Sequence, residues 1–183
     1  MDSRSRAMHK AAKIALMGFD VDGVLTDGTL YFSSAGDEIK AFSSLDGHGI
    51  KMLMAAGIHV AIISGRSSRA LELRAENLGI RHLFMGADDK PRVMSELLAS
   101  LSLDFARAGY MGDDVVDIPI LRACGFAATV ADGHEEVRRD VDFVSLRGGG
   151  KGGAREVCDF ILDAQGRLAP MMAVYRQQSS ARS

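Results

Sequence analysis

Short apolar runs alternate along this chain with longer stretches in which apolar residues recur at helical spacing. The short runs are apolar throughout, as in strands that are buried on both faces of a sheet. Strands that alternate with helices predict a parallel sheet joined by crossover helices. We therefore predict an α/β fold, a three-layer Rossmann-like parallel sheet with helices on both faces. The predicted strands are 14–19, 58–63, 82–85, 108–111, 126–130 and 142–145, and the predicted helices are 47–56, 67–78, 91–101, 115–123, 134–139 and 153–164.

One segment breaks this alternation. Residues 29–32 and 38–42, joined by a turn that contains Gly36, have the pattern of a β-hairpin. An isolated pair of strands is only marginally stable in water and cannot hide much apolar surface. The hairpin therefore either folds back on its own sheet or meets a partner surface. Its apolar residues are Leu30, Tyr31, Phe32, Ile39 and Phe42.

Composition narrows the class of protein. The 183 residues are 47% hydrophobic and 25% charged, with a net charge of -2, which fits one globular domain. Such a balance gives no long-range field for nucleic acid or for a membrane surface. No apolar run approaches a membrane span or a signal peptide. Cys124 and Cys158 are isolated from other ligand residues, so we expect reduced thiols and a cytoplasmic protein.

Two carboxylates directly follow the first predicted strand, in the run DVDGVLTDG. Asp20 and Asp22 are two residues apart, so on an extended backbone both side chains leave on the same side. Such a pair at the end of a buried strand is costly unless a cation or a proton is shared. By itself the pair could equally be two solvated acids in an Asp-Gly turn.

Polar groups also follow the later strands. Ser64, Gly65 and Arg66 end the second strand, Lys90 follows the third, and the run GDDVVD follows the fourth. Each has a bland interpretation as a helix cap or a solvated charge. Ligands of open parallel sheets bind at the carboxyl ends of the strands, so these groups should share one mouth. The acids of the last run are Asp113, Asp114 and Asp117.

This set of groups indicates phosphoryl transfer. Clustered carboxylates without His or Cys favour Mg²⁺, which prefers oxygen ligands. A hydroxyl, free backbone N–H groups and an ammonium group complement a phosphoryl group. With one carboxylate as nucleophile and another as proton donor, the predicted reaction passes through an aspartyl phosphate.

At these residues the sequence resembles the haloacid dehalogenase-like (HAD) phosphatases, over essentially residues 14–164. The runs DVDGVLTDG, KAFSSLDGHGIK, IISGR, GDDVVD and GGKGGAREVCDFIL look like the branch that hydrolyses 3-deoxy-D-manno-octulosonate 8-phosphate in lipopolysaccharide sugar synthesis. The resemblance divides the chain into a basic N-terminal extension (1–13), the phosphatase domain (14–164, with the hairpin 29–42 in place of a cap domain) and a C-terminal tail (165–183).

The resemblance also implies roles for the site residues. Asp20 would be the nucleophile and Asp22 the acid and base. The Asp20 side chain, the Asp22 backbone carbonyl and Asp113 would hold Mg²⁺, with Asp114 and Asp117 supporting them. Ser64, Gly65 and Lys90 would hold the phosphoryl group, whereas Arg66, Arg74, Lys151 and Arg155 are the candidate contacts to the sugar acid.

Neither interval between the motifs has room for a large cap, so the mouth should be open in a monomer. The resemblance implies a homotetramer in which hairpins pack together and the C-terminal Gly-rich segment lies over a neighbour's site. Arg66 favours the eight-carbon substrate over a nine-carbon ulosonate 9-phosphate, because relatives that act on the latter tend to have an acid there. A receiver-like phosphoacceptor, a phosphomutase and a non-catalytic binding domain are less favoured alternatives.

Overall fold

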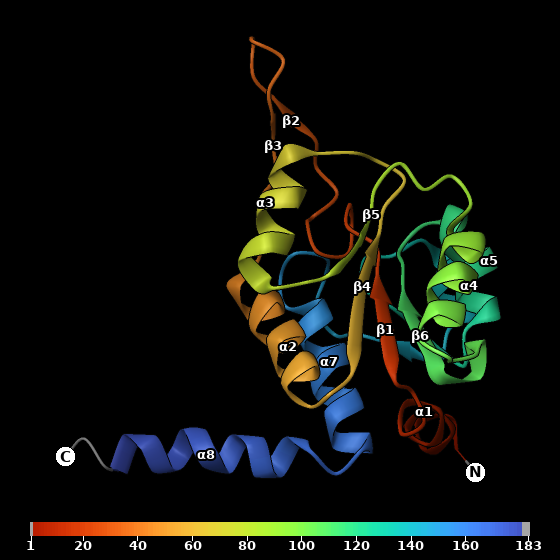
Figure 1. Cartoon of the computed structure of the whole chain (residues 1–183), viewed down its shortest axis with the longest axis vertical. Helices are drawn as coiled ribbons and strands as arrows, with labels where there is room; N and C mark the ends of the chain where they lie inside the picture. The colour runs from red at the N-terminus through yellow and green to blue at the C-terminus, as the bar shows by residue number, and fades with distance from the viewer. Residues whose placement is uncertain (1, 181–183) are drawn as a thin grey trace.

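The structure, a computed structural model, describes residues 2–180, with side chains as far as Arg176. Its centre is a six-stranded parallel sheet in the order β5-β4-β1-β6-β7-β8 (Figure 1), which confirms the predicted α/β fold. The sheet strands are β1 (Leu16–Phe19), β4 (His59–Ile63), β5 (His82–Phe84), β6 (Ala108–Met111), β7 (Phe126–Thr129) and β8 (Phe143–Val144).

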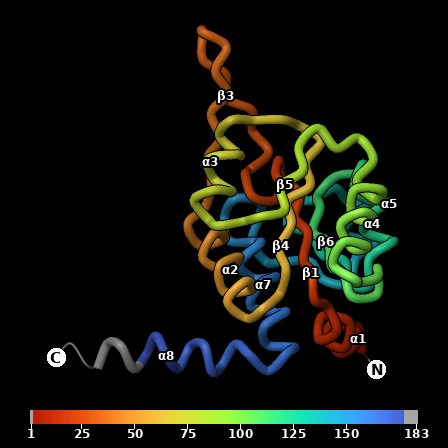
Figure 2. The backbone as a smooth tube through the Cα atoms, viewed as in Figure 1, coloured from red at the N-terminus to blue at the C-terminus, as the bar shows by residue number. Residues whose placement is uncertain are grey.

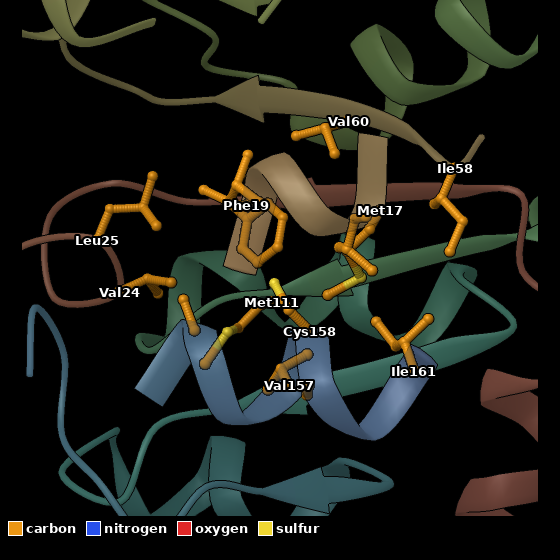
Figure 3. Close-up of a cluster of buried hydrophobic side chains, with 14 of the residues drawn as sticks. Met17, Phe19, Val24, Leu25, Ile58, Val60, Met111, Val157, Cys158 and Ile161 are labelled. Atoms are coloured by element: carbon orange, nitrogen blue, oxygen red, sulfur yellow. The ribbon is translucent and has the colours of Figure 1, made fainter. Parts of the chain in front are cut away.

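Strand β1 lies inside the sheet, paired with β4 on one side and β6 on the other. All four of its residues are buried, because successive side chains enter the two opposite cores. Met17 and Phe19 pack against helix α7 (Gly153–Ala164), whereas Leu16 belongs to the second core (Figure 3). The residue that follows β1 is Asp20, so the fold places it at the middle of the sheet edge.

Helices cover both faces of the sheet. One face packs against α1 (Ser3–Ala11), α2 (Ser44–Ala55), α3 (Arg69–Leu78) and α7. The other packs against α4 (Lys90–Ser100), α5 (Ile118–Ala123) and α6 (Glu135–Asp140). The predicted three layers are therefore present.

The largest departures from the predicted elements lie at the two ends of the chain. The basic extension contains α1, whose Ala7 and Ala11 are buried. The tail contains α8 (Leu168–Ser180), whose Leu168, Met171 and Met172 pack against the core while the helix runs out past the edge of the domain (Figure 1). The α1 segment is mainly polar, so its pattern did not reveal a helix, whereas Leu168, Met171 and Tyr175 of α8 do recur at helical spacing. Two short 3₁₀ helices, Phe105–Arg107 and Val115–Asp117, account for further differences.

The predicted hairpin is present as β2 (Tyr31–Phe32) and β3 (Glu38–Ile39), an antiparallel pair that is separate from the main sheet. It projects from the same end of the domain as the carboxyl ends of the strands, opposite to α8 (Figures 1 and 2). Phe32 is 60% exposed and Ile39 58% exposed. The alternative in which the hairpin folds back on its own sheet is therefore wrong.

The Gly-rich segment 148–153 packs against the loop that follows β1. Gly150 donates its N–H to the carbonyl of Val24 at 3.0 Å, and Gly149 donates its N–H to Oδ1 of Asp132 at 2.9 Å. A Cβ atom on Gly149 would lie 2.6 Å from the carbonyl oxygen of Thr26. Glycine is required there because two backbones touch, and the segment is not the flexible link that its composition suggests.

Helix α7 begins at the last residue of this segment, and a residue of helix α2 binds its N-terminus. The buried carboxylate of Asp46, in α2, accepts N–H groups from Gly152 at 3.3 Å and from Arg155 at 2.8 Å. Burial raises the pKa of Asp46, against the lowering effect of these hydrogen bonds. The contact satisfies free N–H groups at the start of α7.

Within residues 2–180, no helix combines the length and the apolar character that crossing a bilayer requires.

We expect Gly149→Ala to lower both thermal stability and activity. The added methyl group must displace backbone at Thr26, at a cost of about 1–3 kcal/mol, and the shift moves the loop that carries the acid pair. The control is Gly166→Ala, where φ is +67° and no atom lies within 4 Å, so that only backbone strain is added. Thermal unfolding and turnover measure both variants. Unchanged activity in a destabilised Gly149→Ala protein would contradict the predicted coupling.

Candidate active site

A cavity of about 460 Å³ opens at the carboxyl ends of β1, β4, β5 and β6. Most of its polar lining comes from the residues that the sequence singled out, although they are far apart along the chain. Crossover connections bring them together, because every parallel strand delivers its following loop to the same edge. The lining residues are Asp20, Asp22, Gly28, Ser64, Gly65, Arg66, Ala87, Asp88, Lys90, Asp113, Asp114 and Val116.

A buried lysine binds two carboxylates at the floor of the cavity. Nζ of Lys90 lies 3.0 Å from Oδ2 of Asp20 and 2.6 Å from Oδ1 of Asp117. Lys90 is the first residue of α4, so the helix start fixes its direction. Burial opposes the charge of Lys90, but the two carboxylates outweigh it and raise its pKa. Lys90 is thus a fixed positive charge beside the predicted nucleophile.

Asp20, Asp113 and Asp117 each have a carboxylate oxygen within 4.8 Å of the others'. Oδ1 of Asp113 is buried and has no hydrogen-bond partner. Gly23, with φ of +87°, brings the backbone so close that a Cβ atom there would strike the Asp113 carboxylate. An unpartnered carboxylate oxygen beside another acid is a donor set that suits Mg²⁺. Asp20 and Asp113 therefore fit the predicted metal site.

The third acid of this cluster has its oxygens occupied by the protein. Oδ1 of Asp117 accepts from Lys90, and Oδ2 accepts the backbone N–H of Asp113 at 3.1 Å and that of Asp114 at 3.4 Å. Asp117 is fully buried. These hydrogen bonds hold Lys90 and the backbone of Asp113 and Asp114 in place. Asp114 caps the same turn through the N–H of Val115 at 2.7 Å.

Asp20 and Asp113, the two candidate ligands, have raised pKa values when no cation is bound. Burial, together with Asp117, raises the pKa of Asp20 to about 6, although Lys90 acts in the opposite direction. Burial and the charges of Asp20, Asp117 and Asp114 raise the pKa of Asp113 to about 7. The physical cause is the same for each: a carboxylate loses its hydration beside other carboxylates.

Ser64 directly follows β4 and is buried. Its Oγ accepts the N–H of Arg66 at 3.2 Å, and its backbone bonds to Phe84 and Ala87 on either side. These contacts hold the Ser64-Gly65-Arg66 turn rigidly at the cavity wall. Ser64 and Gly65 thus line the cavity together with Lys90 and Asp20, where a phosphoryl oxygen would bind.

Sequence reasoning missed two residues near Asp22. Lys40, just after β3, forms an ion pair with Asp22, and its side chain is only 2% exposed. Nζ of Lys40 also lies 2.9 Å from Oε1 of Glu38. Arg66 approaches the same two acids, with Nε 3.7 Å from Oδ2 of Asp22 and Nη2 3.5 Å from Oε1 of Glu38. The signal available in the sequence was that Glu38 and Lys40, which carry opposite charges, are two residues apart in the hairpin.

Three predicted substrate contacts lie outside this cavity. Arg74 donates to the carbonyl oxygen of Ser43 at 3.0 Å and thereby holds the start of α2. Arg155 pairs with Asp159 along α7 at 2.8 Å. Lys151 is exposed in the Gly-rich segment. Within one chain, Arg66 is the predicted carboxylate contact that lines the cavity.

A parallel α/β sheet whose central strand ends in an Asp-x-Asp pair, with a Ser, a Lys and a second acid cluster in one cavity, is the arrangement of the HAD superfamily of phosphatases.

Comparisons with known proteins narrow this class. No family model matches the chain. It is 44% identical over 161 residues to the 3-deoxy-D-manno-octulosonate 8-phosphate phosphatase KdsC of Yersinia pestis, covering 88% of this chain and 86% of the relative. Identity to the Salmonella typhi protein of that name is 42% over 164 residues, 90% of this chain and 87% of the relative.

Solved structures that resemble this chain include phosphatases of the same name. The phosphatase from Moraxella catarrhalis, in complex with a magnesium ion, a phosphate ion and 3-deoxy-D-manno-octulosonate (KDO), matches with a TM-score of 0.91 and 39% identity, covering 93% of this chain and 98% of the other. That from Yersinia pestis matches with a TM-score of 0.88 and 43% identity, covering 90% and 89%. The chain belongs to the 3-deoxy-D-manno-octulosonate 8-phosphate phosphatase family, which consists of phosphoric monoester hydrolases.

We expect Mg²⁺ to stabilise the protein more strongly as the pH rises. With raised pKa values near 6 and 7, Asp20 and Asp113 hold protons in the metal-free folded state that the unfolded chain releases near pH 4. The metal-free protein should therefore lose stability from about pH 4 to 7, whereas Mg²⁺ binds the ionised carboxylates. The rise in Tm on adding Mg²⁺ should be small near pH 5 and large near pH 8.

The control variant is Asp113→Asn, which keeps the size of the side chain and should remove most of the Mg²⁺-dependent rise in Tm at every pH. A rise of equal size at both pH values in the unmodified protein would show that these carboxylates do not bind the ion.

Proposed function

We propose that this protein is a Mg²⁺-dependent phosphatase that hydrolyses 3-deoxy-D-manno-octulosonate 8-phosphate to KDO and inorganic phosphate. The observation that carries the proposal is the convergence of Asp20, Asp113, Ser64 and Lys90 on one cavity in a chain of this family. The Moraxella catarrhalis relative, with its magnesium ion, phosphate ion and KDO molecule, supports the substrate class.

In the first step a carboxylate oxygen of Asp20 attacks phosphorus, and the bond from phosphorus to the sugar oxygen breaks. Asp22 donates its proton to that leaving oxygen, so that the sugar leaves as a neutral alcohol. The products of this step are KDO and a phosphoryl group bound to Asp20. Lys90 and the Ser64 turn hold the phosphoryl oxygens throughout, since both face this part of the cavity.

In the second step water attacks phosphorus and Asp22 takes the proton that the water releases. The bond from phosphorus to Asp20 breaks, which frees inorganic phosphate and restores both carboxyl groups. Asp22 thus returns to the protonated state needed for the next cycle.

The Asp20 side chain, the Asp22 backbone carbonyl and Asp113 would hold the Mg²⁺ ion, while Asp114 and Asp117 orient them. When bound, the ion supplies positive charge that offsets the negative charge on the phosphoryl group. Lys90 supplies further positive charge at the same place, and its contacts with Asp20 and Asp117 fix it there before substrate binds.

We place the sugar acid over Arg66, whose guanidinium lines the cavity and can bind a carboxylate. The cavity is open in one chain, and the hairpin exposes Tyr31, Phe32 and Ile39. Both features support a homotetramer in which hairpins pack together and a neighbour's C-terminal segment covers the site. Lys151 and Arg155 would then act on a neighbour's substrate, whereas Arg74 supports the α2 start.

The reduced state of Cys124 and Cys158, which are both free and buried, supports a cytoplasmic enzyme. A nine-carbon ulosonate 9-phosphate is the main alternative substrate, because it is also a sugar acid phosphate, but Arg66 favours the eight-carbon compound.

Replacing Lys90 should abolish most of the chemistry. We expect Lys90→Met to lower kcat by about 10²- to 10³-fold, since a preorganised charge on the phosphoryl group is lost. Steady-state kinetics measure the change, and thermal unfolding checks that Asp117 is tolerated without its partner. Lys51→Met, in an exposed residue of α2, is the matched control. Near-normal turnover by a folded Lys90→Met protein would refute the assigned role.

A panel of sugar phosphates tests the substrate. We expect phosphate release to be fastest from 3-deoxy-D-manno-octulosonate 8-phosphate, slower from the nine-carbon ulosonate 9-phosphate, and lost in EDTA until Mg²⁺ is restored. Phosphate release, measured at equal substrate concentrations, ranks the compounds. Equal rates on unrelated phosphoesters would leave the phosphatase class standing and remove the eight-carbon substrate.

A further inference from the structure

Lys40 is a buried cation that has no role in the mechanism described above. Lys40 stands where the hairpin returns to the domain, and its side chain is 2% exposed although the hairpin around it is largely exposed. Burying an ammonium group is costly unless acceptors replace its water. The acceptors are the carboxylates of Asp22 and Glu38, which belong to different segments.

The four charged side chains form a closed set. Lys40 contacts Asp22 and Glu38, and Arg66 approaches the same two acids at 3.7 and 3.5 Å. Two cations thus face two carboxyl groups. The contact between Lys40 and Glu38 is an ion pair at 2.9 Å. The hydrogen bond of Lys40 goes to Oδ1 of Asp22.

This contact fixes a side chain that would otherwise rotate. Asp22 lines the cavity with its side chain 21% exposed, and no other hydrogen bond to its carboxylate is present among the described residues. With Oδ1 bound to Lys40, Oδ2 remains for a second contact, and it lies on the side of Arg66, which also lines the cavity. A carboxyl group must be held in a narrow range of positions to pass a proton efficiently.

We propose that Lys40 is the positioning residue that orients the Asp22 carboxyl group for proton transfer to the leaving sugar oxygen, with Glu38 holding Lys40 in place. The inference rests on the proposed phosphatase function and adds a residue from the hairpin to its machinery. The hairpin therefore contributes to the chemistry of its own chain, in addition to any contact with other chains.

The test compares two leaving groups. A sugar alkoxide is a poor leaving group and needs the proton from Asp22, whereas 4-nitrophenolate leaves readily without it. We expect Lys40→Met to lower kcat for 3-deoxy-D-manno-octulosonate 8-phosphate by about 10- to 100-fold and kcat for 4-nitrophenyl phosphate by less than about threefold. Lys40→Arg, which keeps a cation, should recover most of the loss.

Two further variants separate positioning from folding. The double variant Lys40→Met with Glu38→Met leaves neither partner of that ion pair buried alone, and it should show the same substrate-dependent loss. Lys51→Met makes the same chemical change at an exposed site and should alter neither rate. The Mg²⁺-dependent rise in Tm should be unchanged in all of them, because Lys40 contacts neither Asp20 nor Asp113 and binds the side chain of Asp22 rather than its backbone carbonyl.

Equal loss on both substrates, or no loss on either, would overturn the role of Lys40. Wild-type protein that hydrolyses 4-nitrophenyl phosphate but not the ulosonate phosphate would instead overturn the proposed substrate. The leaving-group comparison is then made with glycerol 2-phosphate as the alkyl ester, so the two failures stay distinguishable.

Discussion

The charge balance around Lys90 is the constraint on which the site depends. Three carboxylates lie within 4.8 Å of one another, and one ammonium group contacts two of them. Three negative charges and one positive charge leave an excess of two negative charges, which one divalent cation neutralises. Without that cation, burial favours proton uptake by Asp20 and Asp113. The excess negative charge of the cluster therefore favours binding of a cation even when no substrate is present.

The rest of the fold holds this unfavourable cluster in place. Asp20 cannot move from the others because β1 is paired on both sides and its side chains are locked in two cores. Asp117 orients Asp113 through a backbone N–H, and Gly23 leaves the room that its carboxylate needs. The hydrophobic burial of the sheet thus offsets the repulsion between the carboxylates at its edge.

A second group of charged side chains lies beside the first. The carboxyl groups of Asp22 and Glu38 face Lys40 and Arg66, so these side chains have cationic partners from the protein itself. The division is chemically useful, because a nucleophile must stay ionised next to the cation whereas a proton donor must be oriented apart from it. The two acids of one Asp-x-Asp pair thereby meet different environments.

The sequence by itself determined the α/β class, the six parallel strands and the polar residues at their carboxyl ends. Apolar runs buried on both faces have few other folds available, and parallel strands must deliver their loops to one edge. It did not reveal α1, which is mainly polar, and α8 was not predicted although Leu168, Met171 and Tyr175 recur at helical spacing. Nor did it reveal the packing of the Gly-rich segment, since two backbones in contact leave no hydrophobic pattern.

Only the tertiary structure decided which charges meet. Nothing in the local pattern singled out Lys40, and the family resemblance implied Arg74 as a substrate contact, yet Lys40 lies against Asp22 whereas Arg74 lies against Ser43. Pairing between groups far apart along the chain depends on where the backbone carries them and on how much water remains there. Neither quantity has a periodicity that can be read along the sequence, which is why the chemistry was foreseen but its supporting contacts were not.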